Sequence, residues 1–565
     1  MSGRRRPIRV VVVSLLLVLI LLTSVYGRAS SRSPDLASRQ AAGSPATPNP
    51  SAGPRFAAAT SEMPLTHRDA SRFGSVTATV PVGSEPVCAT YDSRDGYVYV
   101  VNFGSENVSV IKGTSLVATI PVGALPECAT YDADNGYVYV ANTGSNSVSV
   151  INGSSAITSL RVDYQPLSSV YDPLDGYLYV ANLGTSNDSL NGTGNITVIH
   201  GTSVVGAIAV SYPPSQIVYD DSNGYVYALS VIPGLCGLLC ETTGSVAVIS
   251  GMSLVGTVSV GNWPSLLTYD GGAGDVYVGE SVPTGLSVIN DTSVIADIPV
   301  NSSSSLFPSG GVYDSFNGDL YVSLIDYGSS GSGSVLVVRG SSILAQIPVG
   351  NQTFQGVYDS GNAVVYEPNW ASNNVSVIEN SSLVATLPVG SEPSIPTYDS
   401  ANGYVYVPNN GSDNVSVIAP PALQANFTEG GALVGTCQPP SVTVSLLGSA
   451  SGGDPPYRLF TWSFGVGYPL SYGSDVNHTF NLTGVFNITL TVTDSAGVNA
   501  SVTQPVTVPP PPACPPIELA EAPPSSAWVE LCLILGAVAI GFVAMAVVVW
   551  KGGRQGRNPP ASPSQ

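Results

Sequence analysis

Residues 131–151 read YDADNGYVYVANTGSNSVSVI, and close relatives of this stretch recur along most of the chain. The Tyr-Asp pair that opens it appears eight times, at intervals of 40 to 50 residues. The tyrosines of these pairs are Tyr91, Tyr131, Tyr171, Tyr219, Tyr269, Tyr313, Tyr358 and Tyr398. A repeat of about 40 residues that contains only strand signals is typical of the blades of a β-propeller.

Each repeat unit contains the signals for four short strands. In the second unit an Asn-Gly turn at 135–136 precedes the alternating run at 137–140, which predicts a hairpin. Further strands are expected at Ser147–Ile151 and around Ile157–Val162. Gly, Ser, Asn and Pro interrupt every run before a helix of about ten residues could form, which excludes an α/β fold.

The two ends of the repeat region complement each other. The eighth unit stops at 419–421 (Ala-Pro-Pro) without a last strand, whereas Ser75–Gly83, ahead of the first unit, matches the last strand of another unit, Leu116–Gly123. We predict that this N-terminal strand completes the final blade, because an open ring would leave sheet edges unpaired. The fold class is therefore all-β, with an eight-bladed propeller. Seven blades is the alternative, because units four to six are irregular.

The repeats resemble the YVTN family of β-propeller repeats, known from archaeal and bacterial surface-layer-like proteins. The signature is visible as Tyr-Val-Ala-Asn at 139–142 and again at 179–182. The resemblance covers residues 73–421 and implies the propeller fold. It implies a cell-surface role only loosely, because propellers carry many different functions.

A different β pattern begins at Ala422. The segments 457–465 (YRLFTWSFG) and 486–494 (FNITLTVTD) resemble a polycystic-kidney-disease (PKD) type domain, an immunoglobulin-like β-sandwich. We expect Trp462 and Phe464 to fill its core. The usual Trp-Asp-Phe-Gly-Asp-Gly motif is Trp-Ser-Phe-Gly-Val-Gly here, so both acidic positions are lost.

Two apolar segments predict export and membrane anchoring. Arginines at positions 4–6 and 9 precede the apolar run 10–22, as in a secretory signal. Residues 531–550 are long enough to span a bilayer as a helix, and the cations that follow predict a cytoplasmic tail. We therefore expect the protein in the cell membrane, with its ectodomain outside the cell.

The resulting division of the chain is 1–27 signal peptide or N-terminal anchor, 28–72 disordered leader, 73–421 β-propeller, 422–508 PKD-like β-sandwich, 509–526 Pro-rich linker, 527–550 transmembrane helix and 551–565 cytoplasmic tail.

The charge balance excludes one class of partner. The chain has 38 acidic residues against 18 Lys and Arg, a net charge of −20, which excludes nucleic acid as a partner. Only 10% of its residues are charged, so uncharged polar side chains carry the solubility. Such a surface changes little with pH and would suit an acidic external medium.

Sequons and cysteines fit an extracellular protein. The candidates for glycosylation are Asn187, Asn191, Asn195, Asn301 and Asn351. The candidates for disulfides are Cys236 with Cys240, in one insertion, and Cys437 with Cys514, which bracket the second domain. The equivalent cysteines of the first two units, Cys88 and Cys128, are expected to be two buried thiols rather than a bridge.

Catalytic chemistry is not indicated. The chain has three histidines, so no His-rich metal site, cofactor site or catalytic site is predicted. His200 is expected to be a turn residue. The repeated aspartates, such as Asp92 and Asp132, are expected to accept backbone hydrogen bonds in each unit's turn, and the tyrosines before them to pack between blades. A ring of these carboxylates around an axial cation is the alternative.

The longer middle units predict a binding face. Their extra residues, 183–194, 229–244 and 325–333, fall between the second and third strands and should emerge on one face. The leading hypothesis is a glycosylated surface protein that binds a protein or glycan, or contributes to the cell envelope, with lattice self-association as a possibility. The alternative is an extracellular hydrolase or lyase with a metal in the central channel.

Overall fold

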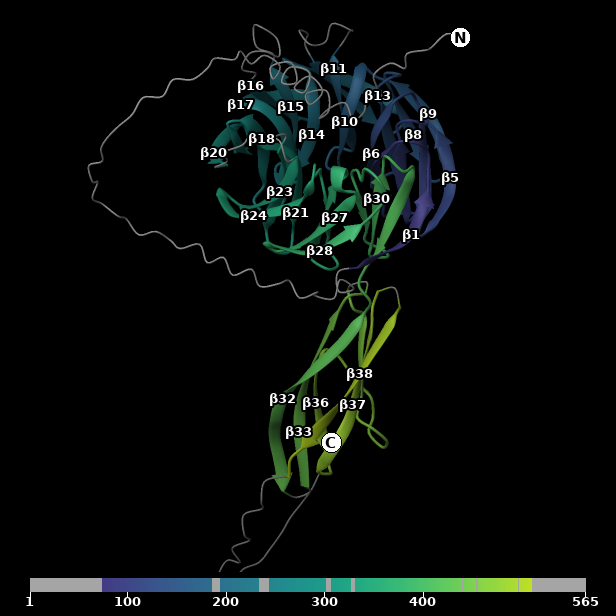
Figure 1. Cartoon of the computed structure of the whole chain (residues 1–565), viewed down its shortest axis with the longest axis vertical. Coiled ribbons are helices and arrows are strands. Elements are labelled where there is room, and N and C mark those ends of the chain that lie inside the picture. The colour runs from purple at the N-terminus through teal and green to yellow at the C-terminus, as the bar shows by residue number, and fades with distance from the viewer. Residues whose placement is uncertain are drawn as a thin grey trace, which may run out of the picture. The chain divides into compact units, whose positions relative to one another are not determined.

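The computed structural model describes residues 74–184, 194–232, 243–300, 306–326, 331–437, 440–453, 456–495 and 497–510. Apart from one 3-10 helix, the regular elements of these residues are β-strands (Figure 1). The expected signal segment, leader and transmembrane helix lie outside this part of the chain. Within it, no helix has the length and apolar character needed to cross a membrane.

The first three repeats each form an antiparallel sheet of four strands, in sequence order. Their strands are β2 (Pro86–Asp92), β3 (Tyr97–Asn102), β4 (Asn107–Lys112) and β5 (Ser115–Pro121); β6 (Pro126–Asp132), β7 (Tyr137–Asn142), β8 (Ser147–Asn152) and β9 (Ser155–Arg161); and β10 (Tyr164–Asp172), β11 (Tyr177–Gly184), β12 (Gly194–His200) and β13 (Ser203–Val210).

The next two repeats share one long strand. The seven strands of their sheet are β14 (Pro214–Asp220), β15 (Tyr225–Ile232), β16 (Thr243–Ser250), β17 (Ser253–Asp270), β18 (Asp275–Val282), β19 (Thr284–Asn290) and β20 (Ser293–Pro299). As far as Asn262, β17 pairs with β16, and from Asn262 onward it pairs with β18. It is thus the outer strand of one repeat and the inner strand of the next.

The sixth and seventh repeats return to four strands each. They consist of β21 (Leu306–Asp314), β22 (Asp319–Asp326), β23 (Ser332–Arg339) and β24 (Ser342–Asn351); and β25 (Val357–Asp359), β26 (Val364–Asn369), β27 (Asn374–Glu379) and β28 (Ser382–Pro388), with the 3-10 helix η3 (Trp370–Ser372) between β26 and β27.

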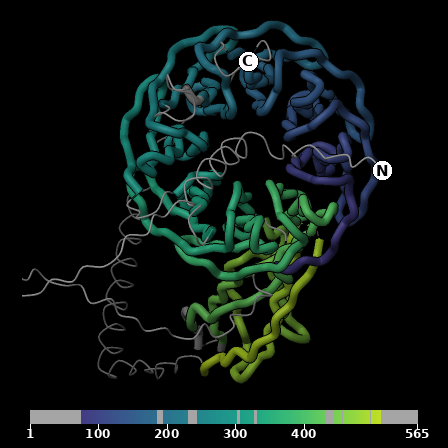
Figure 2. The backbone as a smooth tube through the Cα atoms, turned by 45° about the horizontal axis from the view of Figure 1, so that its top comes forward, coloured from purple at the N-terminus to yellow at the C-terminus, as the bar shows by residue number. Residues whose placement is uncertain are grey.

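The last sheet joins the two ends of the repeat region. It contains β29 (Thr397–Asp399), β30 (Tyr404–Asn409), β31 (Asn414–Ala419) and the N-terminal β1 (Ser75–Pro81). β1 runs antiparallel to β31, with Ser75 opposite Ala419 and Val80 opposite Val415. The predicted closing strand is therefore confirmed, and Figure 2 shows the sheets arranged in a ring.

The hydrophobic core lies between neighbouring sheets. At the closing point, Val80 of β1 and Tyr406 of β30 pack in one buried cluster with Val98 and Val100 of β3. Similar clusters fill the spaces between the other sheets. The second and third strands of the repeats are therefore buried on both faces, as their near-continuous Val, Ile and Tyr runs indicate, whereas the outer strands are largely exposed.

The C-terminal described region is a second β structure. Its sheets have the orders β32-β33-β36 and β35-β34-β37-β38. The strands are β32 (Gln424–Cys437), β33 (Pro440–Ser451), β34 (Leu459–Ser463), β35 (Ser471–Tyr472), β36 (Asp475–Phe480), β37 (Gly484–Thr493) and β38 (Asn499–Val508). Trp462 and Phe464 are fully buried, as predicted. The Trp462 ring packs edge-on against Phe427, and its indole N–H donates to the Gly473 carbonyl at 2.8 Å.

Candidate functional site

The repeated aspartates are structural residues of the turns. All eight are buried, and in each the Oδ1 atom accepts the backbone N–H two residues later, at 2.8–3.0 Å. This confirms the predicted turn role. None of the eight lines the central pocket described below, so they do not form an axial ring of cation ligands.

The tyrosines of the Tyr-Asp pairs connect neighbouring blades, as expected. Burial and the Asp399 carboxylate of the last sheet raise the pKa of Tyr91 in the first sheet. Tyr171 donates to Asp134 of the preceding repeat at 2.5 Å. The contact between Tyr91 and Asp399 crosses the closing point, so the same link continues around the ring.

A second row of tyrosines was missed by the sequence analysis. These tyrosines occupy the middle of the second strand of each repeat and are fully buried. Seven of them donate their hydroxyls to a carbonyl of the following repeat at 2.8–3.0 Å; the pairs are Tyr99–Gly153, Tyr139–Gly201, Tyr179–Gly251, Tyr227–Asp291, Tyr277–Gly340, Tyr321–Asn380 and Tyr406–Gly113. Their recurrence in every repeat was the available signal.

In the repeats that carry it, the asparagine at the end of the second strand clamps the end of the hairpin. The Nδ2 atom of Asn102 donates to Asn107 Oδ1 at 2.8 Å and to Ser109 Oγ at 3.0 Å. The same pattern recurs at Asn369 and Asn409. The Asn-Val-Ser triplet on the third strand thus supplies the acceptors of a buried clamp, which accounts for its resemblance to a sequon.

One glycosylation candidate, Asn195, takes part in this clamp. Asn195 is buried; its Oδ1 accepts from Asn182, and its Nδ2, the atom that would carry a glycan, donates to Asp163. The Asn195 amide is therefore not available to a glycan in this structure. Asn351 is exposed at the end of β24. The candidates Asn187, Asn191 and Asn301 lie outside the described residues.

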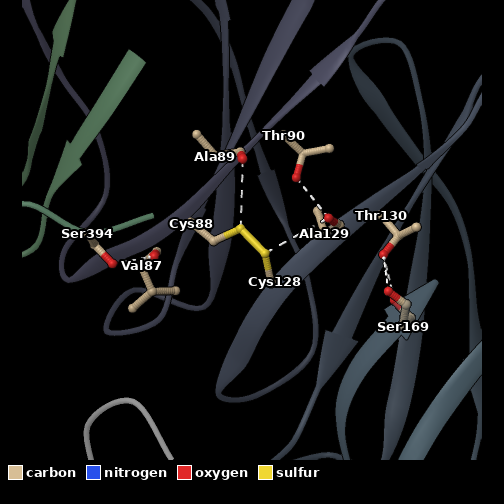
Figure 3. Close-up of a disulfide and its surroundings, with 9 residues drawn as sticks. All are labelled: Val87, Cys88, Ala89, Thr90, Cys128, Ala129, Thr130, Ser169 and Ser394. Atoms are coloured by element: carbon tan, nitrogen blue, oxygen red, sulfur yellow. Dashed lines mark hydrogen bonds between the residues drawn. A yellow bond between two sulfur atoms is a disulfide. The ribbon is translucent and has the colours of Figure 1, made fainter. Parts of the chain in front are cut away.

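The cysteine expectation for the first two repeats was wrong. Cys88 and Cys128 form a disulfide, with their Cα atoms 5.5 Å apart (Figure 3). They occupy the same position of neighbouring inner strands, and the ring brings these strands together although 40 residues separate them. Of the other candidates, Cys236, Cys240 and Cys514 lie outside the described residues, and Cys437 is placed only by its backbone, at the end of β32.

The inner strands surround a pocket of about 580 Å³, which we call the channel pocket. Residues from all eight repeats line it, including the Cys88–Cys128 disulfide. The volume lies within the usual range for small-molecule sites, about 300–1,000 Å³. Its lining reaches Glu85, Glu392 and Trp370, which lie in loops on one face of the ring.

Two sets of loops meet on that face. The loops before the inner strands bond to the loops between the second and third strands: Phe103 N–H donates to the Glu85 carbonyl at 2.9 Å, and Asn410 N–H donates to the Glu392 carbonyl at 2.9 Å. The predicted insertions fall in loops of this second kind, between β11 and β12, between β15 and β16, and between β22 and β23. We call this the loop face.

The loop face carries backbone strain at equivalent positions. Six residues lie at equivalent positions at the start of the inner part of a repeat and have φ between 49° and 56°. Gln165 and Trp263 lie within β10 and β17, and the others precede the inner strand. We call them the rim residues: Glu85, Leu125, Gln165, Trp263, Gln352 and Glu392. This left-handed conformation costs a non-glycine residue roughly 1–2 kcal/mol. A neighbouring blade helps to hold it, since the N–H of Glu85 donates to Asp413 Oδ1 at 2.9 Å.

Two glutamates have strongly perturbed pKa values. Burial raises the pKa of Glu127, in the channel pocket, to about 7. Burial also raises the pKa of the fully buried Glu367 to about 8, against the opposing effect of the Ser323 hydroxyl, which donates to Glu367 Oε2 at 2.9 Å. Sequence reasoning missed both, although no other repeat has a charged residue at the position equivalent to either glutamate.

The described residues contain no group of three or more His, Cys, Asp or Glu side chains arranged to hold a metal ion. His200 is exposed at the end of β12, where its ring packs edge-on against Tyr177. It therefore occupies the turn position expected of it. His478 is buried in the second domain, where burial lowers its pKa.

Comparison with known proteins agrees with the two parts of the fold. Residues 436–509 match the model of the PKD domain family. Among solved structures, Saccharomyces cerevisiae Sqt1 aligns with a TM-score of 0.50 at 9% identity, over 61% of this chain and 98% of that one. This likeness shows the propeller fold alone. The chain thus carries a β-propeller followed by a PKD domain.

Two further solved structures align less closely. Kuenenia stuttgartiensis hydrazine synthase has a TM-score of 0.41 at 18% identity, over 60% of this chain and 96% of that one. The β-propeller domain of Myceliophteria thermophila Cps50 (Swd1) has a TM-score of 0.41 at 9% identity, over 54% and 99%. No curated protein matches the sequence.

Proposed function

We propose that this chain is a membrane-anchored, glycosylated cell-surface protein whose propeller binds a protein or glycan outside the cell. One observation carries the proposal: the channel pocket, the rim residues and the flanks of the three insertions share the loop face. Loops that a rigid scaffold positions are the usual place for recognition. Strained positions that persist in several repeats also point to function.

The rim residues support recognition in a second way. Their backbone conformation is the same, but their side chains are Glu, Leu, Gln, Trp, Gln and Glu. The positions of the turn aspartates and buried tyrosines, by contrast, keep one residue type throughout the ring. Positions that vary on a constant backbone are suited to discriminate between ligands.

Anchoring and glycosylation rest on the sequence. The segments 10–22 and 527–550 support export and a membrane stem. We propose Asn187, Asn191, Asn301 and Asn351 as the glycan acceptors. Mass spectrometry of the protein from its own host tests them, and unmodified peptides at all four would remove this part of the proposal.

We also infer that the ring has eight blades. When the two halves of β17 are counted separately, every Tyr-Asp unit has four strands, and β1 supplies the outer strand of the last one. Class averages of the particle in electron microscopy should show eightfold pseudo-symmetry. Sevenfold averages would contradict the inference.

The perimeter of the ring supports association with a second copy of the chain. The outer strands expose apolar pairs at equivalent positions near their start; they include Leu116, Val117, Val204, Val205, Leu254, Val255, Ile343 and Leu344. The only charged residues of these eight outer strands are Arg161 and Asp297. In a chain of net charge −20, copies can approach most closely along such an uncharged belt.

Sedimentation of the full-length protein in nanodiscs tests this association. We expect oligomers, and we expect their population to fall in the Val117→Lys/Val205→Lys variant. The control is Phe316→Ser, which changes an exposed apolar residue in the turn between β21 and β22. A monomer at all concentrations, or binding of a different protein to the belt, would contradict it.

Replacement of the three insertions tests the main proposal. Residues 185–193, 233–242 and 327–330 would each be replaced by a short Gly-Ser linker, and binding to glycan arrays and to envelope proteins would be measured. We expect at least a tenfold loss of binding with unchanged thermal unfolding, and no loss in Phe316→Ser. Equal binding after replacement of all three insertions would refute the proposal.

A further inference from the structure

We propose that the channel pocket binds a primary ammonium group carried on an apolar stem, with Glu127 as its counter-ion. The site differs from the loop surface proposed above for macromolecular binding, although it opens on the same face. The residues that line the pocket favour a ligand with an apolar body and a positive charge.

The wall of the pocket is mainly apolar. It includes Val87, Leu167, Ile217, Leu266, Phe354 and Ile395, together with the Cys88–Cys128 disulfide. Ser, Thr, Gln and Asn side chains also line the pocket, so the polar end of a ligand can find hydrogen-bond partners there. The apolar wall suits an alkyl or aryl body, which gains free energy when it leaves water.

The charges at the pocket have one sign. Glu85, Glu127 and Glu392 line it, whereas none of the described lining residues is Lys, Arg or His. A phosphate or carboxylate ligand would therefore find no positively charged partner among these residues and would be repelled by the three glutamates. The absence of a three-ligand metal cluster among the described residues also favours an organic cation over a metal ion.

Glu127 is the carboxylate best placed to receive this cation. The equivalent positions of the first and third repeats are the apolar Val87 and Leu167, so the repeat itself does not require a charge there. Its Oε1 atom is buried and has no hydrogen-bond partner, and the Thr143 side chain is the one group that offsets the effect of burial on this carboxyl. A charge in such surroundings is costly unless it is paired, and a bound ammonium group would supply the pair.

Trp370 adds a second feature that suits a cation. It lies in η3, the 3-10 helix between the second and third strands of the seventh blade, and it lines the pocket. Aromatic faces attract ammonium groups through the negative face of the ring. Carboxylate, aromatic and apolar groups thus converge on one cavity.

The test uses full-length protein in zwitterionic nanodiscs, with empty discs as the blank. The probes are n-hexylammonium, its neutral counterpart 1-hexanol, and Nα-acetyl-lysine N-methylamide, which distinguishes a free amine from a lysine side chain. Saturation-transfer NMR and calorimetry would measure their affinities. We expect n-hexylammonium to bind at least tenfold more tightly than 1-hexanol.

Glu127→Gln should weaken n-hexylammonium binding at least tenfold and leave 1-hexanol unchanged, whereas Glu429→Gln, an exposed carboxylate on β32, should have no effect. Trp370→Leu should weaken n-hexylammonium binding several-fold. This variant provides the test if Glu127→Gln does not fold. Equal binding of the amine and the alcohol would overturn the proposal. Such a failure would leave the loop-replacement result unaffected, so the two proposals can fail separately.

Discussion

The Tyr406 hydroxyl donates to the Gly113 carbonyl at 3.0 Å, although 293 residues separate them. Tyr406 lies in the last sheet and Gly113 in the turn between β4 and β5 of the first, so this bond crosses the point where the ring closes. It joins the same two repeat positions as the Tyr99–Gly153 bond within the ring, which is 2.8 Å long. The closing point is therefore held by the same contacts as the other blade boundaries.

Tyr406→Phe should lower the free energy of unfolding by about 1 kcal/mol, because it removes one net hydrogen bond without opening a cavity. Tyr99→Phe should cost the same, since its bond lies between two ordinary neighbours. Urea unfolding of the two variants gives the comparison. A much larger loss for Tyr406→Phe would indicate a closing point weaker than the other boundaries.

Loss of the Cys88–Cys128 disulfide should destabilise the propeller by about 2–4 kcal/mol, since the bond closes a loop of about 40 residues in the unfolded chain. Thermal unfolding of the Cys88→Ala/Cys128→Ala variant, with and without reductant, measures this. Any change in the unfolding temperature that reductant still causes in the variant comes from the other cysteines. If wild type and variant unfold at the same temperature, the bond contributes nothing.

Glu367 should make the protein more stable in acid than in alkali. Its carboxyl keeps its proton up to about pH 8 in the folded state but ionises near 4.5 in the unfolded chain. The folded state thus holds an extra proton between these values, and its stability declines as the pH rises through this window. Glu127, with a folded pKa of about 7, acts in the same direction.

Glu367→Gln should be more stable than wild type at pH 8 by a few kcal/mol, because each pKa unit corresponds to about 1.4 kcal/mol. Near pH 4.5 the two proteins should differ little. Urea unfolding at both pH values checks the sign, with Glu429→Gln as an exposed control. A variant less stable than wild type at pH 8 would show that the ionised carboxylate has a partner.

Ala363→Gly should stabilise the seventh repeat. Ala363 has a φ of 54° at the turn position where seven other repeats place a glycine with positive φ. The glycine relieves a strain of roughly 1–2 kcal/mol but costs about 0.5–1 kcal/mol of chain entropy, so a net gain of about 0.5–1 kcal/mol is expected. The converse change, Gly318→Ala, meets no atom within 4 Å and should lose a similar amount. Changes of the same sign in both variants would contradict this account.

The repeat sequence was sufficient to predict the ring, because each 40-residue unit contains its own turn and strand signals. The exchange of β1 into the last sheet was also predictable, since the eighth unit lacked one strand and Ser75–Gly83 matched it. The turn role of the aspartates followed from their recurrence. Local turn and strand signals can be read from one sequence, and so can a repeated pattern.

Features that depend on distances across the ring were not predictable. The disulfide was missed because a spacing of 40 residues does not reveal that two inner strands lie side by side. The channel pocket was missed because each repeat contributes only one or a few residues to it. Glu127 and Glu367 are single departures from the repeat, and their significance appears only when their burial is known.

A cysteine pair across the closing strands tests the central claim most directly. Ser75 and Ala419 are register partners at the end of the β1–β31 ladder and take no part in the asparagine clamps. In the Ser75→Cys/Ala419→Cys variant, mass spectrometry of the folded monomer should find these two positions joined by an intramolecular disulfide. Absence of that link, or a link only between two copies of the chain, would contradict a ring closed by its own N-terminal strand.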